Sequence, residues 1–366
     1  MRFGLGFLLS LSTLTLIVSC AGEPPQGPVD SQRQSILERV DKAPVIHYFT
    51  TSADGEHSVL WRAALDAASS ATETVARSRL QLVPHAAGYA PRGAISRSGR
   101  MAWLNLPPDR RHGDSAQLWL GGEIVDERAL YLQTPMFLGE DLYYLRRSPG
   151  PARVGPDGKL LQTLDDFELV RLAPSGAERI VHTESALWFH FVGQSPAAAS
   201  RLLVLRVRDD GTDLLEFARE GKLIATHFLG TGSVRDVRVN PAQQDRVTYL
   251  RSSGGPAGAE VRELALAGHP STTSGWRQAK VLRANLHGYA SPLPLRSGAL
   301  LLAEGDPFSE PFFAVPLDEV SAGVVLWRED RQNQLTYVLR GPGDRVRRLA
   351  PPGDAAQDVS LLRAGL

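Results

Sequence analysis

The sequence predicts an all-β protein, and within that class a β-propeller. Short apolar strands recur every few tens of residues, each preceded by a polar turn that contains Gly or Pro. Several of these strands, such as Leu202–Leu205 and Leu300–Leu302, are apolar on both faces. A strand in a two-sheet sandwich hides one face and should alternate, whereas inner propeller strands are covered by a blade on each side. After residue 45 no long amphipathic helical pattern competes with this interpretation.

The spacing of the apolar runs predicts seven blades. The runs begin near residues 45, 101, 142, 202, 247 and 299, with one more near 324 or 335. Dividing residues 44–366 by seven gives about 46 residues per blade, near the period of propeller repeats. Six blades would need about 54 residues each and eight about 40, so both numbers stay open.

The clearest repeat unit is Ser233–Arg251. It contains a strand at Val234–Val239, a turn at Asn240-Pro241 and a second strand at Arg246–Leu250. In the second strand apolar and polar residues alternate with the period of two that is typical of a strand. Related phrases follow Ala94, Pro135 and Pro292.

Further strands are predicted wherever an apolar run lies between turn signals such as Asp-Gly. They are Val45–Thr50, Ser58–Asp66, Met101–Leu106, Gln117–Leu120, Leu142–Arg147, Phe167–Leu172, Arg201–Val207, Leu214–Ala218, Val261–Leu266, Ala299–Ala303, Phe312–Pro316, Val324–Arg328 and Leu335–Arg340. A helix competes with the strand Ser58–Asp66, because the residues that follow, Ala67–Ala71, are rich in Ala and Ser.

The C-terminal segment Asp358–Leu362 follows the turn at Pro351-Pro352-Gly353 and is predicted to be a strand. We expect it to pair with the strand that begins at Val45. That pairing would close the ring and cover the strand edges of the first blade.

Composition excludes some functions. The chain has 366 residues, with 22% charged and 43% apolar side chains, which is typical of a folded globular protein. Forty Lys and Arg residues balance forty Asp and Glu residues. The chain therefore has no excess of basic residues, which would have indicated a nucleic-acid partner.

Residues 1–19 have the features of a signal peptide. Arg2 supplies the positive charge, and Phe7–Val18 is an apolar run that is shorter than the roughly 20 residues needed to span a bilayer. The motif Ile17-Val18-Ser19-Cys20 resembles the lipobox of bacterial lipoproteins. The resemblance implies cleavage before Cys20 and lipidation of this residue, the only cysteine of the chain. An ordinary secretory signal that happens to contain a cysteine is the alternative.

The lipobox divides the chain into a signal peptide (1–19), a lipid-anchored tether (20–44) and a propeller domain (45–366). Residues 20–44 are rich in Pro, Gln and charge, and a short helix at Ser31–Lys42 is as compatible with them as a disordered chain. Ala21 follows the cysteine, whereas enteric lipoproteins kept in the inner membrane have Asp there. The resemblance therefore implies the outer membrane, facing the periplasm or the cell surface.

Three turn phrases resemble the S-P-D-G-K…I-A-Y phrase of TolB-type propellers of bacterial envelopes. They are Ser96–Trp103, Gly155–Lys159, and Asn240-Pro241 with Val247–Tyr249. Only Pro156–Lys159 keeps the P-D-G-K core. The resemblance covers residues 45–366 and implies a scaffold for protein–protein contact.

No catalytic signature is present: the chain lacks G-x-S-x-G, H-E-x-x-H and Walker motifs. We expect no cofactor and no metal. His190 is expected to be a core histidine, and Asp209–Asp213 a solvated turn rather than a Ca²⁺ loop. Arg146-Arg147, like Arg345, Arg347 and Arg348, are expected to be exposed charges on edge strands.

The leading functional hypothesis is a non-enzymatic, membrane-anchored scaffold that binds another envelope protein or a glycan. The expected binding residues lie beside the strands that begin the blades, where loops are free of packing: Tyr89, Arg92, Arg235, Asp236, His287 and Tyr289. The alternative is a hydrolase or lyase acting on polysaccharide, with His190, His227 or His287 in the central channel. A purely structural envelope protein is the third possibility.

Overall fold

The computed structural model describes residues 45–364, with gaps at 53, 66–76, 111–114, 152, 162–163, 196–200, 244, 253–257, 267–278, 309, 332–333, 342–345 and 350–358. The predicted signal peptide, Cys20 and tether lie outside these residues, as does the Ala67–Ala71 segment. The described residues form strands and turns and contain no helix that could cross a membrane. The prediction of an all-β protein is confirmed.

Most strands belong to four-stranded antiparallel sheets that follow one another along the chain. Sheet 1 contains β1 (Val45–Thr51), β2 (His57–Ala64), β3 (Arg77–Pro84) and β28 (Val359–Leu361); sheet 2 contains β4 (Arg92–Ile95), β5 (Met101–Asn105), β6 (Ser115–Leu120) and β7 (Glu123–Leu130). Sheet 3 contains β8 (Met136–Leu138), β9 (Asp141–Ser148), β12 (Asp165–Leu172) and β13 (Glu178–Ala186). The pairing of Ala129 with Arg146 joins sheets 2 and 3 at one edge.

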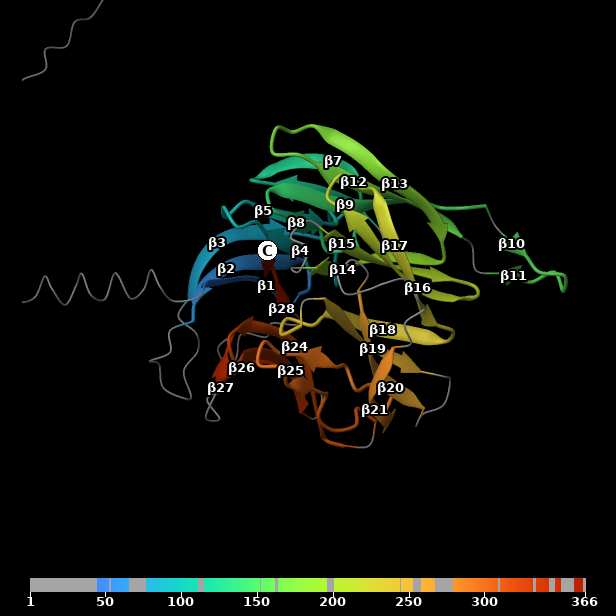
Figure 1. Ribbon diagram of the computed structural model, residues 1–366. Coiled ribbons are helices and arrows are strands. Elements are labelled where there is room, and N and C mark those ends of the chain that lie inside the picture. The colour runs from blue at the N-terminus through green and yellow to red at the C-terminus, as the bar shows by residue number, and fades with distance from the viewer. Residues whose placement is uncertain are drawn as a thin grey trace, which may run out of the picture. The chain divides into compact units, whose positions relative to one another are not determined.

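The same pattern continues in the second half. Sheet 4 contains β14 (Trp188–Ser195), β15 (Arg201–Arg208), β16 (Gly211–Ala218) and β17 (Leu223–Gly230), and sheet 5 contains β18 (Ser233–Val239), β19 (Arg246–Ser252), β20 (Ala259–Ala265) and β21 (Lys280–Leu286). Sheet 6 has two strands among the described residues, β22 (Leu293–Pro294) and β23 (Leu300–Leu301). Sheet 7 contains β24 (Phe312–Ser321), β25 (Val324–Arg331), β26 (Gln334–Arg340) and β27 (Val346–Arg348). Figure 1 shows these sheets in chain order around a centre.

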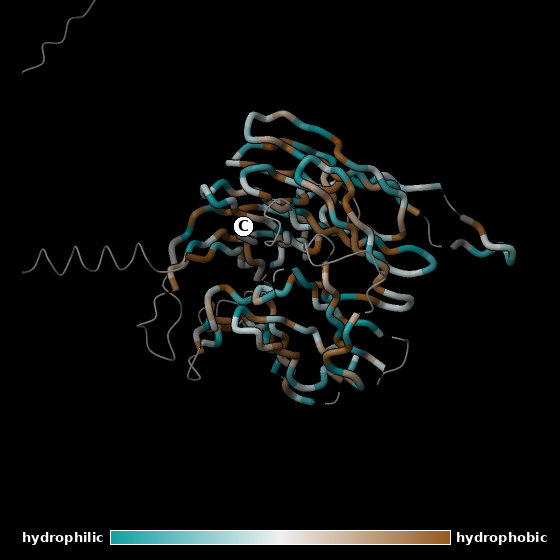
Figure 2. Tube along the Cα trace, viewed as in Figure 1, coloured by the Kyte–Doolittle hydropathy of each residue, from teal (hydrophilic) through white to brown (hydrophobic). Residues whose placement is uncertain are grey.

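Hydrophobic clusters between successive sheets make the ring. Each of seven clusters joins a sheet to the next one, from Phe49 and Trp103 between sheets 1 and 2 to Leu293 and Trp327 between sheets 6 and 7. The seventh cluster packs sheet 7 against sheet 1. Hydrophobic residues are accordingly spread over all the sheets instead of gathering in one layer (Figure 2). This closed series of packed sheets is a β-propeller, as the sequence predicts. The number of blades stays a prediction, because the sixth position has two described strands instead of four.

The C-terminal strand closes the ring as expected. Strand β28 pairs with β1 in the register Tyr48 to Leu361, and β29 (Arg363–Ala364) continues in parallel beside β4. The last segment therefore covers the inner edges of both sheet 1 and sheet 2. The Tyr48 hydroxyl also donates a hydrogen bond to the Leu349 carbonyl, 3.1 Å away, and so links sheet 1 to the chain that follows sheet 7.

The P-D-G-K turn does not lie in a blade sheet, which corrects its interpretation as a blade phrase. Gly158 donates its N–H to the Gly155 carbonyl and has a φ of 77°, the left-handed conformation that favours glycine. The flanking strands β10 (Arg153–Val154) and β11 (Leu160–Leu161) pair only with each other, in a hairpin inserted between β9 and β12. Figure 1 shows this hairpin away from the other strands. The Ser96 turn, in contrast, joins β4 to β5 within sheet 2.

Arg146 is buried, which contradicts its prediction as an exposed edge charge. Its guanidinium lies between sheets 2 and 3, with Nε donating to Asp126 Oδ2 at 2.6 Å and Nη2 donating to Glu178 Oε2 at 2.7 Å. The Tyr144 hydroxyl donates to the same Asp126 oxygen at 2.7 Å. Burial alone would raise the pKa of Asp126, but these hydrogen bonds and the N–H of Arg128 together hold that pKa below its usual value. The Arg146 guanidinium can be buried between sheets 2 and 3 because Asp126 and Glu178 accept its hydrogen bonds and balance its charge.

Candidate functional site

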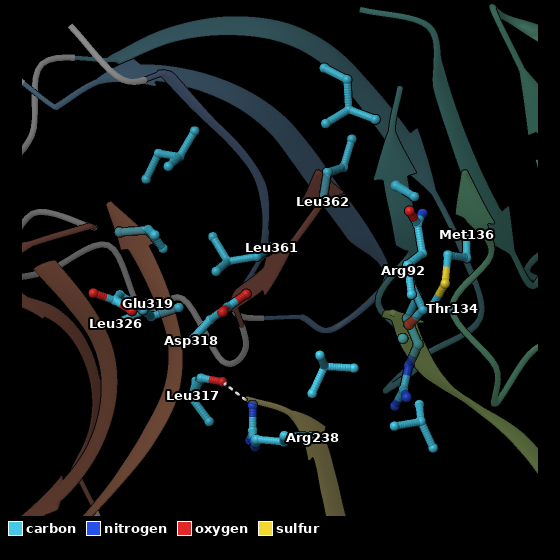
Figure 3. A pocket seen from close by; sticks show the side chains of 18 of the residues that line it. Arg92, Thr134, Met136, Arg238, Leu317, Asp318, Glu319, Leu326, Leu361 and Leu362 are labelled. Carbon is cyan, nitrogen blue, oxygen red and sulfur yellow. Dashed lines mark hydrogen bonds between the residues drawn. The ribbon is translucent and has the colours of Figure 1, made fainter. Parts of the chain in front are cut away.

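The inner strands of the sheets enclose a central cavity of about 710 Å³. Its wall takes residues mainly from β1, β4, β8, β14, β18, β22, β24 and β28, which lie at or next to the inner edge of each sheet. Figure 3 shows side chains from several of these strands pointing toward a shared space. Cavities in which several chain segments meet are the usual place for a ligand.

The wall combines an apolar lining with a few charged groups. Leu317, Leu326, Leu361 and Leu362 are among its apolar residues, and its charged residues are Arg92, Arg238, Arg296, Asp318 and Glu319. His47 also lies on the wall, where burial and then the nearby Arg62 charge lower its pKa. Both effects favour the neutral imidazole.

We call the end of the sheets at which the chain enters the inner strands the front mouth. Three of the predicted binding residues meet there. The Arg235 guanidinium donates a hydrogen bond to the Gly288 carbonyl and lies 5.7 Å from the Tyr289 ring centre. The His287 ring stacks on Tyr289 with centroids 6.1 Å apart. The structure thus places the side chains of Arg235, His287 and Tyr289 close together.

Phe308 completes this group, and the sequence analysis did not identify it. Its ring meets Tyr289 edge to face at 5.3 Å, and its side chain is 77% exposed. Asp306 lies on the same loop as Phe308, and its carboxylate oxygen is 3.8 Å from His287 Nε2. We call Arg235, His287, Tyr289 and Phe308 the aromatic cluster.

Tyr89 and Arg92 form a second group around Tyr131. The Tyr89 and Tyr131 rings meet edge to face at 5.4 Å, and the Arg92 guanidinium lies 5.5 Å from the Tyr131 centroid. Tyr131 is nearly buried and donates its hydroxyl to the Ala90 carbonyl at 2.7 Å. Arg92 lines the cavity, whereas Tyr89 packs against the core between sheets 2 and 3. Asp236 lies in a bulge of β18 with a φ of 51°.

His190 and His227, which the hydrolase or lyase alternative would place in the central channel, do not line the cavity. His227 Nε2 is 2.6 Å from the fully buried Glu216 carboxylate, within sheet 4. Neither His190 nor His227 is among the described residues that line the cavity, and His47 is the histidine found there. Asp213, expected in a solvated turn, is instead buried, and its carboxylate lies 2.8 Å from Arg206 and 3.0 Å from Arg208.

Comparison with known proteins adds distant similarities of fold. No family model matches the chain, and no curated protein matches it. TolB from Acinetobacter baumannii is 10% identical over 87% of this chain and 67% of that one, with a TM-score of 0.44. Prolyl oligopeptidase B from Galerina marginata is 11% identical over 88% of this chain and 53% of that one, with a TM-score of 0.47.

An oligogalacturonate lyase from Vibrio parahaemolyticus is 9% identical over 83% of this chain and 90% of that one, with a TM-score of 0.39. The chain thus spans about half of the peptidase and most of the lyase. Because these structures include enzymes, and all are remote, they do not distinguish binding from catalysis. The assignment of a propeller depends on the sheets and clusters of this chain itself.

Proposed function

We propose that the chain is an envelope lipoprotein whose propeller binds another envelope protein or a glycan without catalysing a reaction. The aromatic cluster carries this proposal. Tyr289 and Phe308 are 41% and 77% exposed, and each lies on a loop rather than in a strand that packs the ring. Exposed aromatic side chains next to Arg are the residue types that dominate binding energy at interfaces.

The geometry of the cluster suits a preformed contact surface. Arg235 is held by the Gly288 carbonyl and the Tyr289 ring, so the start of β18 and the loop before β22 are fixed relative to each other. A partner that covers Phe308 and Tyr289 would remove apolar surface from water without first ordering these loops. The same rings offer flat apolar faces to a sugar if the partner is a glycan.

Replacing both Arg235 and Tyr289 by Ala is expected to weaken partner capture by about tenfold or more, because hot-spot residues each contribute roughly 2 kcal/mol or more. Melting should change by a few degrees at most, since both side chains are exposed. Capture would be measured by pull-down from membranes with the intact lipoprotein, and melting by circular dichroism.

Arg328→Ala provides the matched control, because Arg328 is an exposed arginine on β25 that lies outside the front mouth. It should retain full capture. Equal capture by the double variant and the control, or loss of capture only in parallel with unfolding, contradicts the proposal.

Cys20→Ser is expected to abolish lipidation and move the protein out of the membrane fraction. The acyl chains provide the membrane affinity, and formal charge adds none because acidic and basic side chains balance. Detergent-phase partitioning measures the change. A Cys20→Ser protein that still enters the detergent phase would show that the lipobox interpretation is wrong.

A further inference from the structure

Strand β17, the outermost strand of sheet 4, has a free edge that lacks charge. It pairs with β16 on one side, and no described strand pairs with its other side. Its sequence is LIATHFLG, which contains no Asp, Glu, Lys, Arg or Pro. The outermost strands of the other four-stranded sheets each contain at least one of these charged residues: β3, β7, β13, β21 and β27. Charged residues and Pro on an outer strand prevent it from pairing with another chain, and β17 lacks this protection.

The side chains of β17 alternate between exposed and covered positions. Ile224, Thr226 and Phe228 are exposed and share one face of the strand, whereas the residues between them are half-buried. Ile224 and Phe228 are 42% and 45% exposed. The Phe228 ring lies close to Gly211 of β16, where a Cβ atom would come within 2.5 Å of the ring. The glycine therefore leaves the space that the ring occupies at the edge of the sheet.

This face of β17 is complementary to the same face of a second copy. A two-fold axis at the level of Thr226 pairs two β17 strands antiparallel and places Thr226 opposite its counterpart. Residues two positions from the axis then meet, so Ile224 of each copy lies opposite Phe228 of the other. Thr–Thr pairs and pairs of an aromatic with a β-branched side chain stabilise antiparallel sheets. Like charges do not oppose each other here, because the strand contains no Asp, Glu, Lys or Arg.

We propose that β17 is a self-association surface, through which two copies of the chain join their fourth sheets into one continuous sheet. The partner is a second copy because β17 itself supplies both members of each favourable pair. The edge is short, since the 8 residues of β17 at about 3.4 Å each span about 27 Å. One strand pair buries less surface than a standard interface of about 1,600 Å², so we expect a weak dimer at micromolar concentration or above. This inference does not depend on the aromatic cluster or on the proposed function.

Sedimentation equilibrium of the full chain in detergent measures the association as the protein concentration rises. Wild type should form a dimer and no larger species, because two-fold pairing uses the free edge of both copies. Thr226→Lys places two like charges opposite each other and should weaken the dimer about fivefold or more. Two controls should retain the dimer. Thr226→Val keeps an uncharged residue that favours strands, and Thr183→Lys adds the same charge to an exposed threonine on the outermost strand of sheet 3.

Disulfide crosslinking tests the register of the pairing. Cys20 is the only cysteine of the chain, so in a Cys20→Ser background an introduced cysteine can pair only with its counterpart. Thr226→Cys should crosslink readily, because the Cβ atoms of directly opposite residues lie about 4.5–5.5 Å apart. Ile224→Cys should crosslink far more slowly, because a residue two positions from the axis lies about 14 Å from its counterpart.

Melting of each variant separates lost pairing from lost folding. Three results would overturn the proposal: a monomer at every concentration up to millimolar, no difference in dimer affinity between folded Thr226→Lys and either control, or crosslinking from position 224 as fast as from position 226. Thr226→Lys should not change partner capture, because Thr226 does not belong to the aromatic cluster. A failure of this proposal therefore leaves the capture experiment on Arg235 and Tyr289 unaffected.

Discussion

Truncation of the chain before Asp358 is expected to lower the melting temperature by about 10 °C or more and to promote aggregation. It removes β28 from β1 and β29 from β4, and it removes Leu362 from the cluster that contains Phe49 and Trp103. Loss of one buried Leu side chain alone costs about 2–5 kcal/mol, and each kcal/mol corresponds to roughly 2–4 °C in a domain of this kind. The unpaired edges of sheets 1 and 2 would then be open to other chains.

A shorter deletion separates the closure of the ring from the mere loss of a tail. Removing Gly365 and Leu366 leaves both C-terminal strands intact and should not change melting. Leu362→Ala should fall between the two deletions, because it loses the packing and keeps the strand pairing. If the truncation before Asp358 melts like the full chain, the C-terminal strand does not close the ring.

Arg146→Met is expected to destabilise the protein by about 3–5 kcal/mol, because it leaves the buried carboxylate of Asp126 without its cation. Burial, followed by the hydrogen bond to Asp126, raises the pKa of Tyr144 above its usual range, so its hydroxyl stays protonated and remains one donor to that carboxylate. The Asp126→Asn, Arg146→Met double variant should recover much of the loss. Urea denaturation at pH 7 measures all three proteins.

Arg128→Met is the matched control, since Arg128 lies 4.0 Å from the same carboxylate but its side chain is 69% exposed. It should cost about 0.5 kcal/mol or less. The contribution of Asp126 to stability depends on pH. The pKa of Asp126 is lowered in the folded protein, so its contribution to stability is present above the ordinary value near 4 and is lost as pH falls through the lowered pKa. The difference between wild type and Arg146→Met should therefore shrink as the pH falls from 7 to about 3, and a constant difference would contradict the assignment.

The middle strands of the sheets could be predicted from the sequence because they are apolar on both faces. Leu202–Leu205 and Tyr249 are examples, each with almost no exposed surface. The outermost strands β7, β13, β17 and β21 were not predicted. Their solvent-facing residues are polar, and even their hydrophobic residues, such as Ile180 and Ile224, are more than 40% exposed. A strand of this kind has no apolar pattern and is defined by its pairing to the strand before it.

Charged residues and turn motifs were less informative about where a segment lies in the fold. Arg146 was predicted to be exposed because charge usually lies outside, yet its partners Asp126 and Glu178 are 20 and 32 residues away and come together only in the folded ring. The P-D-G-K turn has the local geometry expected of it, but that geometry is compatible with any tight hairpin. Ala299–Ala303, predicted as a full strand, is reduced to Leu300–Leu301 in the two-stranded sheet 6.

The candidate site, too, could be predicted from the sequence only in part. Three of the six predicted binding residues meet at the front mouth, since the starts of the inner strands and the loops before them lie at one end of the sheets. Phe308 and Tyr131 have no signal in the sequence that separates them from other loop aromatics. Arg238 was part of a predicted strand, and only its place on the cavity wall distinguishes it. Which strand residues line the cavity depends on packing across sheets, which a strand pattern does not encode.

Site-specific photo-crosslinking tests the binding surface most directly. A photoreactive amino acid would replace Tyr289 in the aromatic cluster and, in a second protein, Arg328 on β25, with both proteins expressed as intact lipoproteins. We predict that position 289 forms a defined crosslink to an envelope protein or glycan and that position 328 does not. Crosslinking to the same partner from position 328 but not from position 289, or no crosslink from 289 while the partner is still captured, would contradict a binding surface at the front mouth.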